Sequence, residues 1–263
     1  MTAVLAAFGA LYGRGWNRLH KDLPSAVPAG RLAAFAGGIS VVWIVVASPA
    51  AHLDHHLLTA HMVQHLLLMM LAAPLILLGA PAIVMMHSLP QGWVRCAVTH
   101  LHGFGTLRLL GMVCTHPAVC WLAGSATVIA WHVPAVFELA LPSQHWHQFE
   151  QASFLVGGIL FWWPVVQPWP SIVNSPRWST PVYLFLATLP CDALSAFLAF
   201  CGHVVYRPYL SQAGHFGLSA LQDQALAGAL MWVTVTFAYL IPALAVTAQL
   251  IASERRRAGV EVF

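Results

Sequence analysis

Residues 61–79 read HMVQHLLLMMLAAPLILLG, and this stretch decides the fold. It contains no Asp, Glu, Lys or Arg, and it is close to the roughly 20 apolar residues that an α-helix needs to cross a bilayer. We therefore expect this segment, written as the span His61–Gly79, to be a transmembrane helix. Five further predominantly apolar stretches predict five more spans, namely Leu32–Pro49, Met112–Val133, Ala152–Val166, Pro181–Cys201 and Ala225–Ile251.

The composition of the whole chain supports an all-α, polytopic transmembrane bundle. Charged residues make up 7% of the 263 residues, whereas an ordinary soluble domain has about 25%. The mean hydropathy is +0.75, and so few charges could not solvate the surface of a soluble protein of this length. The length fits one membrane domain, residues 1–263. Met1–Tyr12 is also apolar but too short to span, so we interpret it as part of a shortened N-terminal helix, which would bring the total to seven.

The basic residues predict the orientation of the bundle. Ten of the eleven Lys and Arg fall on one side of the predicted spans, and only Arg207 falls on the other. By the positive-inside rule the rich side is cytoplasmic, and the C-terminus lies there. The net charge of +3 gives no support for a nucleic-acid partner. The ten residues are Arg14, Arg18, Lys21, Arg31, Arg95, Arg108, Arg177, Arg255, Arg256 and Arg257.

This topology places ten of the fifteen histidines at the outer face, together with four acidic residues and almost no Lys or Arg. Such a surface is suited to accepting cations. The histidines are His52, His55, His56, His61, His65, His132, His145, His147, His203 and His215, and the acids are Asp54, Glu138, Glu150 and Asp223.

Five of these side chains form the candidate metal site. His61 and His65 are four residues apart, so both rings leave one face of a helix. His132 ends the next span, and His147 and Glu150 begin the one after it, at the same predicted depth. Imidazole suits copper, zinc and iron alike. The competing interpretation is that these interfacial histidines only bond backbone carbonyls or lipid headgroups.

Soft sulfur ligands tilt the choice of metal towards reduced copper. Met62, Met69 and Met70 lie close to the histidine pair in sequence. The five cysteines include no Cys-x-x-Cys pair, and we interpret them as packing residues, with Cys201 as a lesser copper candidate.

The remaining polar and aromatic groups of the sequence show no signature of a catalytic site. Asp192 lies inside a predicted span, where it could hold the bundle together or belong to a polar path with Thr188 and Ser195. The runs Phe161–Pro164 and Pro168–Pro170 are typical of a helix end at the membrane interface. The sequence has no nucleophile elbow, phosphate loop, His-Glu-x-x-His or Cys-x-x-Cys-His motif, so we expect a non-catalytic role.

Four segments in order resemble the multi-spanning CtaG family of cytochrome c oxidase assembly factors. They are Ala60–Leu68, then Trp131–Pro134, then His147–Glu150 with Phe154-Leu155 and Phe161–Val165, and finally Asp223–Gly228 running into Met231–Val233. The resemblance extends from Arg14 to the final helix. The chain departs from the family pattern in two places: Gln151 follows Glu150 where we expect a histidine, and the first helix is shorter than in the family.

The resemblance implies an assembly factor of the bacterial cytoplasmic (inner) membrane. It implies that copper is helped to reach the copper B centre of the catalytic subunit of a haem-copper oxidase, with periplasmic copper chaperones as further partners. Two alternatives stay open at this point. One is a copper transport or homeostasis protein. The other is a haem-binding electron-transfer protein in which His61 or His65 pairs with His132.

Overall fold

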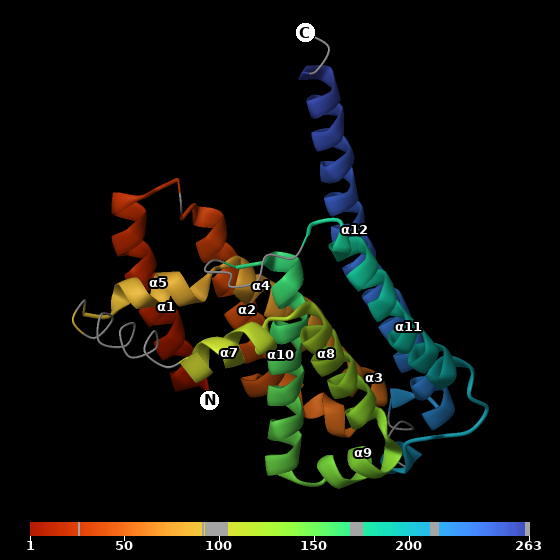
Figure 1. Ribbon diagram of the computed structural model, residues 1–263. Helices are drawn as coiled ribbons and strands as arrows, with labels where there is room; N and C mark the ends of the chain where they lie inside the picture. Colours follow the sequence, from red (N-terminus) through yellow and green to blue (C-terminus); the bar gives the residue numbers. More distant parts are fainter. Residues whose placement is uncertain (26, 91, 93–104, 169–175, 211–215, 261–263) are drawn as a thin grey trace.

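The computed structural model describes residues 1–25, 27–90, 92, 105–168, 176–210 and 216–260, and within these ranges it contains helices and no strand (Figure 1). The helices are α1 (Thr2–Asp22), α2 (Ala29–Ala47), η1 (Pro49–His55), α3 (Leu58–Leu66), η2 (Leu67–Ala72), α4 (Ala73–Leu78), α5 (Pro81–Ser88), α7 (Gly105–Cys114), α8 (Pro117–His132), α9 (Pro134–Ala140), α10 (Gln144–Val166), α11 (Ser179–Phe200), η3 (Arg207–Leu210) and α12 (Ala220–Val260).

Five helical segments of the described chain are long and apolar enough to cross a membrane. They are α2, the continuous run Leu58–Leu78 formed by α3, η2 and α4, then α10, α11 and α12. These correspond to five of the six expected spans, so the expected all-α membrane bundle is confirmed. Helix α10 begins eight residues before the expected start at Ala152, which removes the apparent shortness of that span.

The third expected span, Met112–Val133, is wrong in its bounds. Met112 belongs to α7, and a new helix begins at Pro117 after His116, whose ring accepts a hydrogen bond from Ala118 N. Proline favours the first position of a helix because it has no N–H to donate. Helix α8 is followed at Pro134 by α9, whose axis is bent by 78° from that of α8. If α8 and α9 together count as one broken span, the described chain has six candidate spans.

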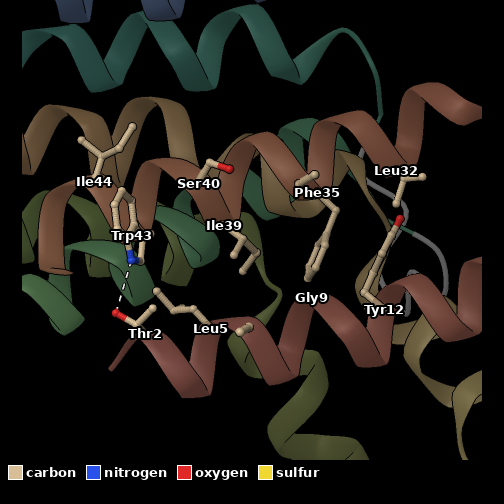
Figure 2. Close-up of a pocket in the computed structure, with 12 residues that line it drawn as sticks. Thr2, Leu5, Gly9, Tyr12, Leu32, Phe35, Ile39, Ser40, Trp43 and Ile44 are labelled. Atoms are coloured by element: carbon tan, nitrogen blue, oxygen red, sulfur yellow. Dashed lines mark hydrogen bonds between the residues drawn. The ribbon is translucent and has the colours of Figure 1, made fainter. Parts of the chain in front are cut away.

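The N-terminal segment forms a longer helix than expected. Helix α1 extends from Thr2 to Asp22, well beyond Tyr12, but its second half carries Arg14, Arg18 and Lys21, and it is not among the five apolar spans. It packs on α5 and α2. Figure 2 shows the apolar pocket between α1 and α2, about 540 Å³ in volume, where Tyr12 stacks on Phe35 with ring centroids 3.8 Å apart.

The centre of the bundle is α10 packed against α8, α4 and η2. Gly158 allows this approach, because a Cβ atom there would lie 2.9 Å from Ala73 Cβ and from Met69 Cα. Segment η2 is a π-helical turn, and its Met69 carbonyl accepts a hydrogen bond from Trp162 Nε1 at 2.9 Å. Helix α10 ends at Val166, two residues after Pro164, as expected for Phe161–Pro164, but Phe161 and Trp162 are buried in the core of the bundle. Of the second aromatic run, Trp169 and Pro170 lie outside the described residues.

Candidate metal centre

Two helices bring three ligand atoms together in the core. His61 and His65 of α3 face Glu150 of α10, and the side chains are exposed by only 1%, 5% and 1%. The two Nε2 atoms lie 2.8 Å apart. Glu150 Oε1 lies 3.3 Å from Nε2 of His61 and 3.1 Å from Nε2 of His65. The predicted i, i+4 pair therefore has a carboxylate partner from a distant part of the chain.

The spacing of these atoms fits a metal ion. A tetrahedral ion bound at about 2.0–2.1 Å separates its ligand atoms by about 3.3 Å, close to the three distances observed. Two imidazole N–H groups cannot face each other at 2.8 Å, so at least one of the two Nε2 atoms carries a lone pair. Glu150 Oε2 is buried, and its contact among the described residues is with Nδ1 of His147, 3.3 Å away. A carboxylate oxygen has two lone pairs, so this atom keeps one that is available to an ion.

His147 and Asp54 form a second donor group beside the first. His147 Nε2 lies 2.8 Å from Asp54 Oδ2, and its Nδ1 lies 3.3 Å from Glu150 Oε2. Asp54, His61 and His147 each offer a ligand atom within 4.8 Å of the others. Burial raises the pKa of the Asp54 carboxyl, but the hydrogen bond to His147 and the nearby histidine charges outweigh it, so the net shift is downward.

A vestibule with both polar and apolar walls lies beside this second group. It has a volume of about 340 Å³ and is lined by Asp54 and His147 together with the exposed His52 and His55. Asp54 and His147 line this vestibule, whereas His61, His65 and Glu150 do not.

Two glutamines connect His147 to the backbone of η1. The Gln64 amide donates to the carbonyl of Ala51 at 2.8 Å, which leaves its oxygen to accept from Gln151 Nε2 at 3.0 Å. Gln151 Nε2 also lies 3.0 Å from Nε2 of His147. The residue that stands where a histidine was expected therefore contacts a candidate ligand through its side-chain amide.

Helix α12 fixes the start of the helix that carries the histidine pair. Helix α3 has no capping side chain of its own. The fully buried Asp223 accepts hydrogen bonds from Leu58 N at 2.7 Å and from Thr59 N at 3.1 Å, and so caps α3 from another helix. Tyr209 of η3 donates to the Asp54 carbonyl at 2.6 Å. These contacts fix the positions of α3 and Asp54, although Asp223 and Tyr209 are distant from them in sequence.

The structure thus brings together four of the five predicted ligands: His61, His65, His147 and Glu150. The fifth, His132, is buried at the end of α8, but neither donor group found among the described residues includes it. Sequence reasoning missed Asp54 as a member of the cluster. The signal for Asp54 was its position as the one acid within the run His52–His56. Cys201 lies near His203 and in neither group, and His215 is outside the described residues.

Comparison with known proteins fits this architecture. Residues 10–253 match the family described as cytochrome c oxidase caa3 assembly factor. The chain belongs to this family. Uncharacterised proteins of Mycobacterium bovis and Mycobacterium tuberculosis are each 26% identical to it over 97% of the chain, and one of Mycobacterium leprae is 24% identical over 94%.

The chain spans 38% of the length of these mycobacterial relatives. No solved structure matches it. The match to the caa3 assembly factor family confirms the resemblance described above.

Proposed function

We propose that this assembly factor binds copper transiently at His61, His65 and Glu150 and passes it to the catalytic subunit of a haem-copper oxidase, for its copper B centre. One observation carries the proposal. Three ligand atoms from two helices converge within 3.3 Å in a buried setting, and each has another ligand atom of the group as its partner. Copper is the cargo here and not a resident cofactor.

The surroundings of the cluster suit a carrier that must release its ion. Three close ligands leave coordination positions open, whereas a closed four-ligand cage would hold the metal. Asp54 and His147 line the vestibule and lie beside the cluster, so they would supply donors along an access route from it. Copper would pass from donor to donor by ligand exchange.

The distribution of charge supports delivery from the outer face. In Figure 1 the start of α3 and helix α9 lie at one end of the bundle, and the C-terminal end of α12 lies at the other. Arg255 and Arg256 lie near that C-terminal end, and Arg177 precedes α11, whereas Arg207 lies in η3 close to Tyr209. By the positive-inside rule the metal cluster faces the periplasm and the C-terminus is cytoplasmic.

The space around the histidines favours an ion over a haem group. The cavity that His65 and His132 both line has a volume of about 20 Å³. Pockets for molecules of cofactor size are typically about 300–1,000 Å³. His65 is also stacked on Phe154 with ring centroids 3.9 Å apart, so its ring face is covered.

The metal content of the oxidase tests the proposal in cells. A strain carrying His61→Ala should keep oxidase polypeptides and haem in the membrane but lose copper from the oxidase. His145→Ala is the matched control, because this substitution also removes one imidazole from the same end of the bundle. His145 is exposed in the first turn of α10. Normal copper with lost haem in the His61→Ala strain would contradict the proposal, as would normal amounts of both.

A further inference from the structure

A small buried cavity is lined by His65 and shares no lining residue with the vestibule. Its volume of about 20 Å³ is enough for one water-sized particle. The π-helical turn η2 contributes Met69 and Met70 to its wall, and α12 contributes Met231. π-Helical turns occur frequently at functional sites.

The donors around this cavity are soft. Met62, Met69 and Met231 have exposures of 2%, 2% and 4%, and Cys191 of α11 is 7% exposed. Methionine and cysteine sulfur select monovalent copper, whereas carboxylates favour harder cations. The cavity wall carries no carboxylate. Its ligand chemistry therefore differs from that of the His61–His65–Glu150 cluster.

His132 presents a ligand atom that has no other use in the described structure. Its Nδ1 lies 2.7 Å from the Val128 carbonyl, so the proton is on Nδ1 and the lone pair is on Nε2. That Nε2 is buried without a hydrogen-bond partner among the described residues, and His132 is only 7% exposed. A ring oriented by a carbonyl through one nitrogen is the usual arrangement of a metal-binding histidine.

We infer that this cavity is a second, separate site that binds one monovalent copper ion through His132 and the sulfur atoms of Met62, Met69, Met231 and Cys191. His65 lies between the two sites, since its Nε2 belongs to the cluster and its ring lines the cavity. It is the one residue shared by both. The inference rests on the proposed function only in taking copper as the cargo.

The second site gives the assembly factor a way to hold reduced copper away from water. An ion that reaches the cluster exchanges ligands at His65 and enters the cavity with its oxidation state unchanged. No electron is transferred in this step, because copper arrives as Cu(I) and is bound as Cu(I). The sulfur ligands would stabilise that state against oxidation to Cu(II).

Copper(I) binding to the purified, detergent-solubilised full chain tests the inference. The background is His61→Ala/Glu150→Gln, which disables the cluster and leaves the cavity intact. Titration is anaerobic against a chromogenic Cu(I) chelator, with Ag(I) as a redox-silent second probe. Into this background Met62→Leu/Met231→Leu is introduced, because leucine keeps the volume of methionine and removes its sulfur. Met85→Leu/Met86→Leu on α5 is the matched control, away from the cavity.

We expect the background protein to bind one Cu(I) per chain, with sulfur in the first coordination shell by X-ray absorption. The Met62→Leu/Met231→Leu pair should weaken Cu(I) and Ag(I) binding by more than about tenfold. Losing a residue that only orients a ligand already weakens metal binding by about tenfold, and losing a ligand should weaken it more. The control pair should bind as the background does.

Equal Cu(I) affinity in the Met62→Leu/Met231→Leu and control proteins would overturn the second site. Loss of all Cu(I) binding in the His61→Ala/Glu150→Gln background, with unchanged thermal unfolding, would also overturn it, but would leave the cluster and the proposed function standing. Failure of the proposed function is distinguishable, because the unmutated protein would then bind no copper at the cluster.

Discussion

Asp223 provides the sharpest test of how the fold positions the candidate metal centre. It lies 165 residues from Leu58 in sequence, and its carboxylate caps the helix that carries His61 and His65. We predict that Asp223→Ala destabilises the protein and weakens copper binding together, although Asp223 is in neither group of candidate ligands.

The magnitude follows from the hydrogen bonds that would be lost. Substitution by alanine leaves Leu58 N–H and Thr59 N–H without their acceptor, while Thr59 Oγ1 can still donate to the backbone carbonyl of residue 223. Each buried unsatisfied group costs about 1–3 kcal/mol, and loss of a helix cap typically costs about 1 kcal/mol. We therefore expect a loss of about 2–4 kcal/mol. Asp223→Asn should lose about half as much, because the amide keeps one acceptor oxygen.

Thermal unfolding in detergent measures this loss, at about 2–4 °C per kcal/mol for a chain of this length. The matched control is Glu138→Gln, an exposed carboxylate on α9 at the same end of the bundle. An Asp223→Ala protein that unfolds at the temperature of the unmutated protein would refute the capping argument. A lowered unfolding temperature with unchanged copper binding would also refute it, because the two effects should arise from one displacement of α3.

Three further predictions follow from the packing and the orientation. Gly158→Ala should destabilise the bundle by about 1–3 kcal/mol in thermal unfolding, because the new Cβ atom would press on Ala73 and Met69. The control Gly30→Ala should leave the unfolding temperature unchanged, because its Cβ atom would lie in open space. Trp162→Phe should cost about 1 kcal/mol in the same assay, by removing the hydrogen bond to the η2 carbonyl. In a Cys201→Ser background, a cysteine at Gln144 should react with an impermeant thiol reagent in intact cells and one at Trp178 should not; the reverse result would invert the topology.

The membrane bundle was predictable because its signal is local. An apolar run such as residues 61–79 predicts a helix without knowledge of its neighbours, and all five long spans were found in this way. The positions at which helices break were less predictable from the sequence than the spans were. Hydropathy continues across Thr115–Pro117, and only the start of a new helix at Pro117 reveals that Met112 belongs to α7. The η2 turn likewise has no sequence signature.

Most of the candidate site was predictable from the sequence, and the rest depends on packing. The i, i+4 spacing of His61 and His65 placed both rings on one face, and Glu150 could be placed at the same depth by topology. Depth alone does not fix which way a side chain points, so it also placed His132 in the cluster, whereas His132 lines the neighbouring cavity with Cys191. Cys191 carried no signal in the sequence beyond its location in an apolar span.

The copper content of the purified protein tests the central claim most directly. The protein is loaded with copper, and excess ion is removed by gel filtration. The unmutated protein should then retain copper at the cluster, whereas the His61→Ala/His65→Ala protein should not. His145→Ala should behave as the unmutated protein does, since His145 is exposed two residues before His147. The account predicts a copper–nitrogen/oxygen signal in X-ray absorption that is strongly reduced in His61→Ala/His65→Ala. Retention of that signal at full intensity in His61→Ala/His65→Ala would contradict it.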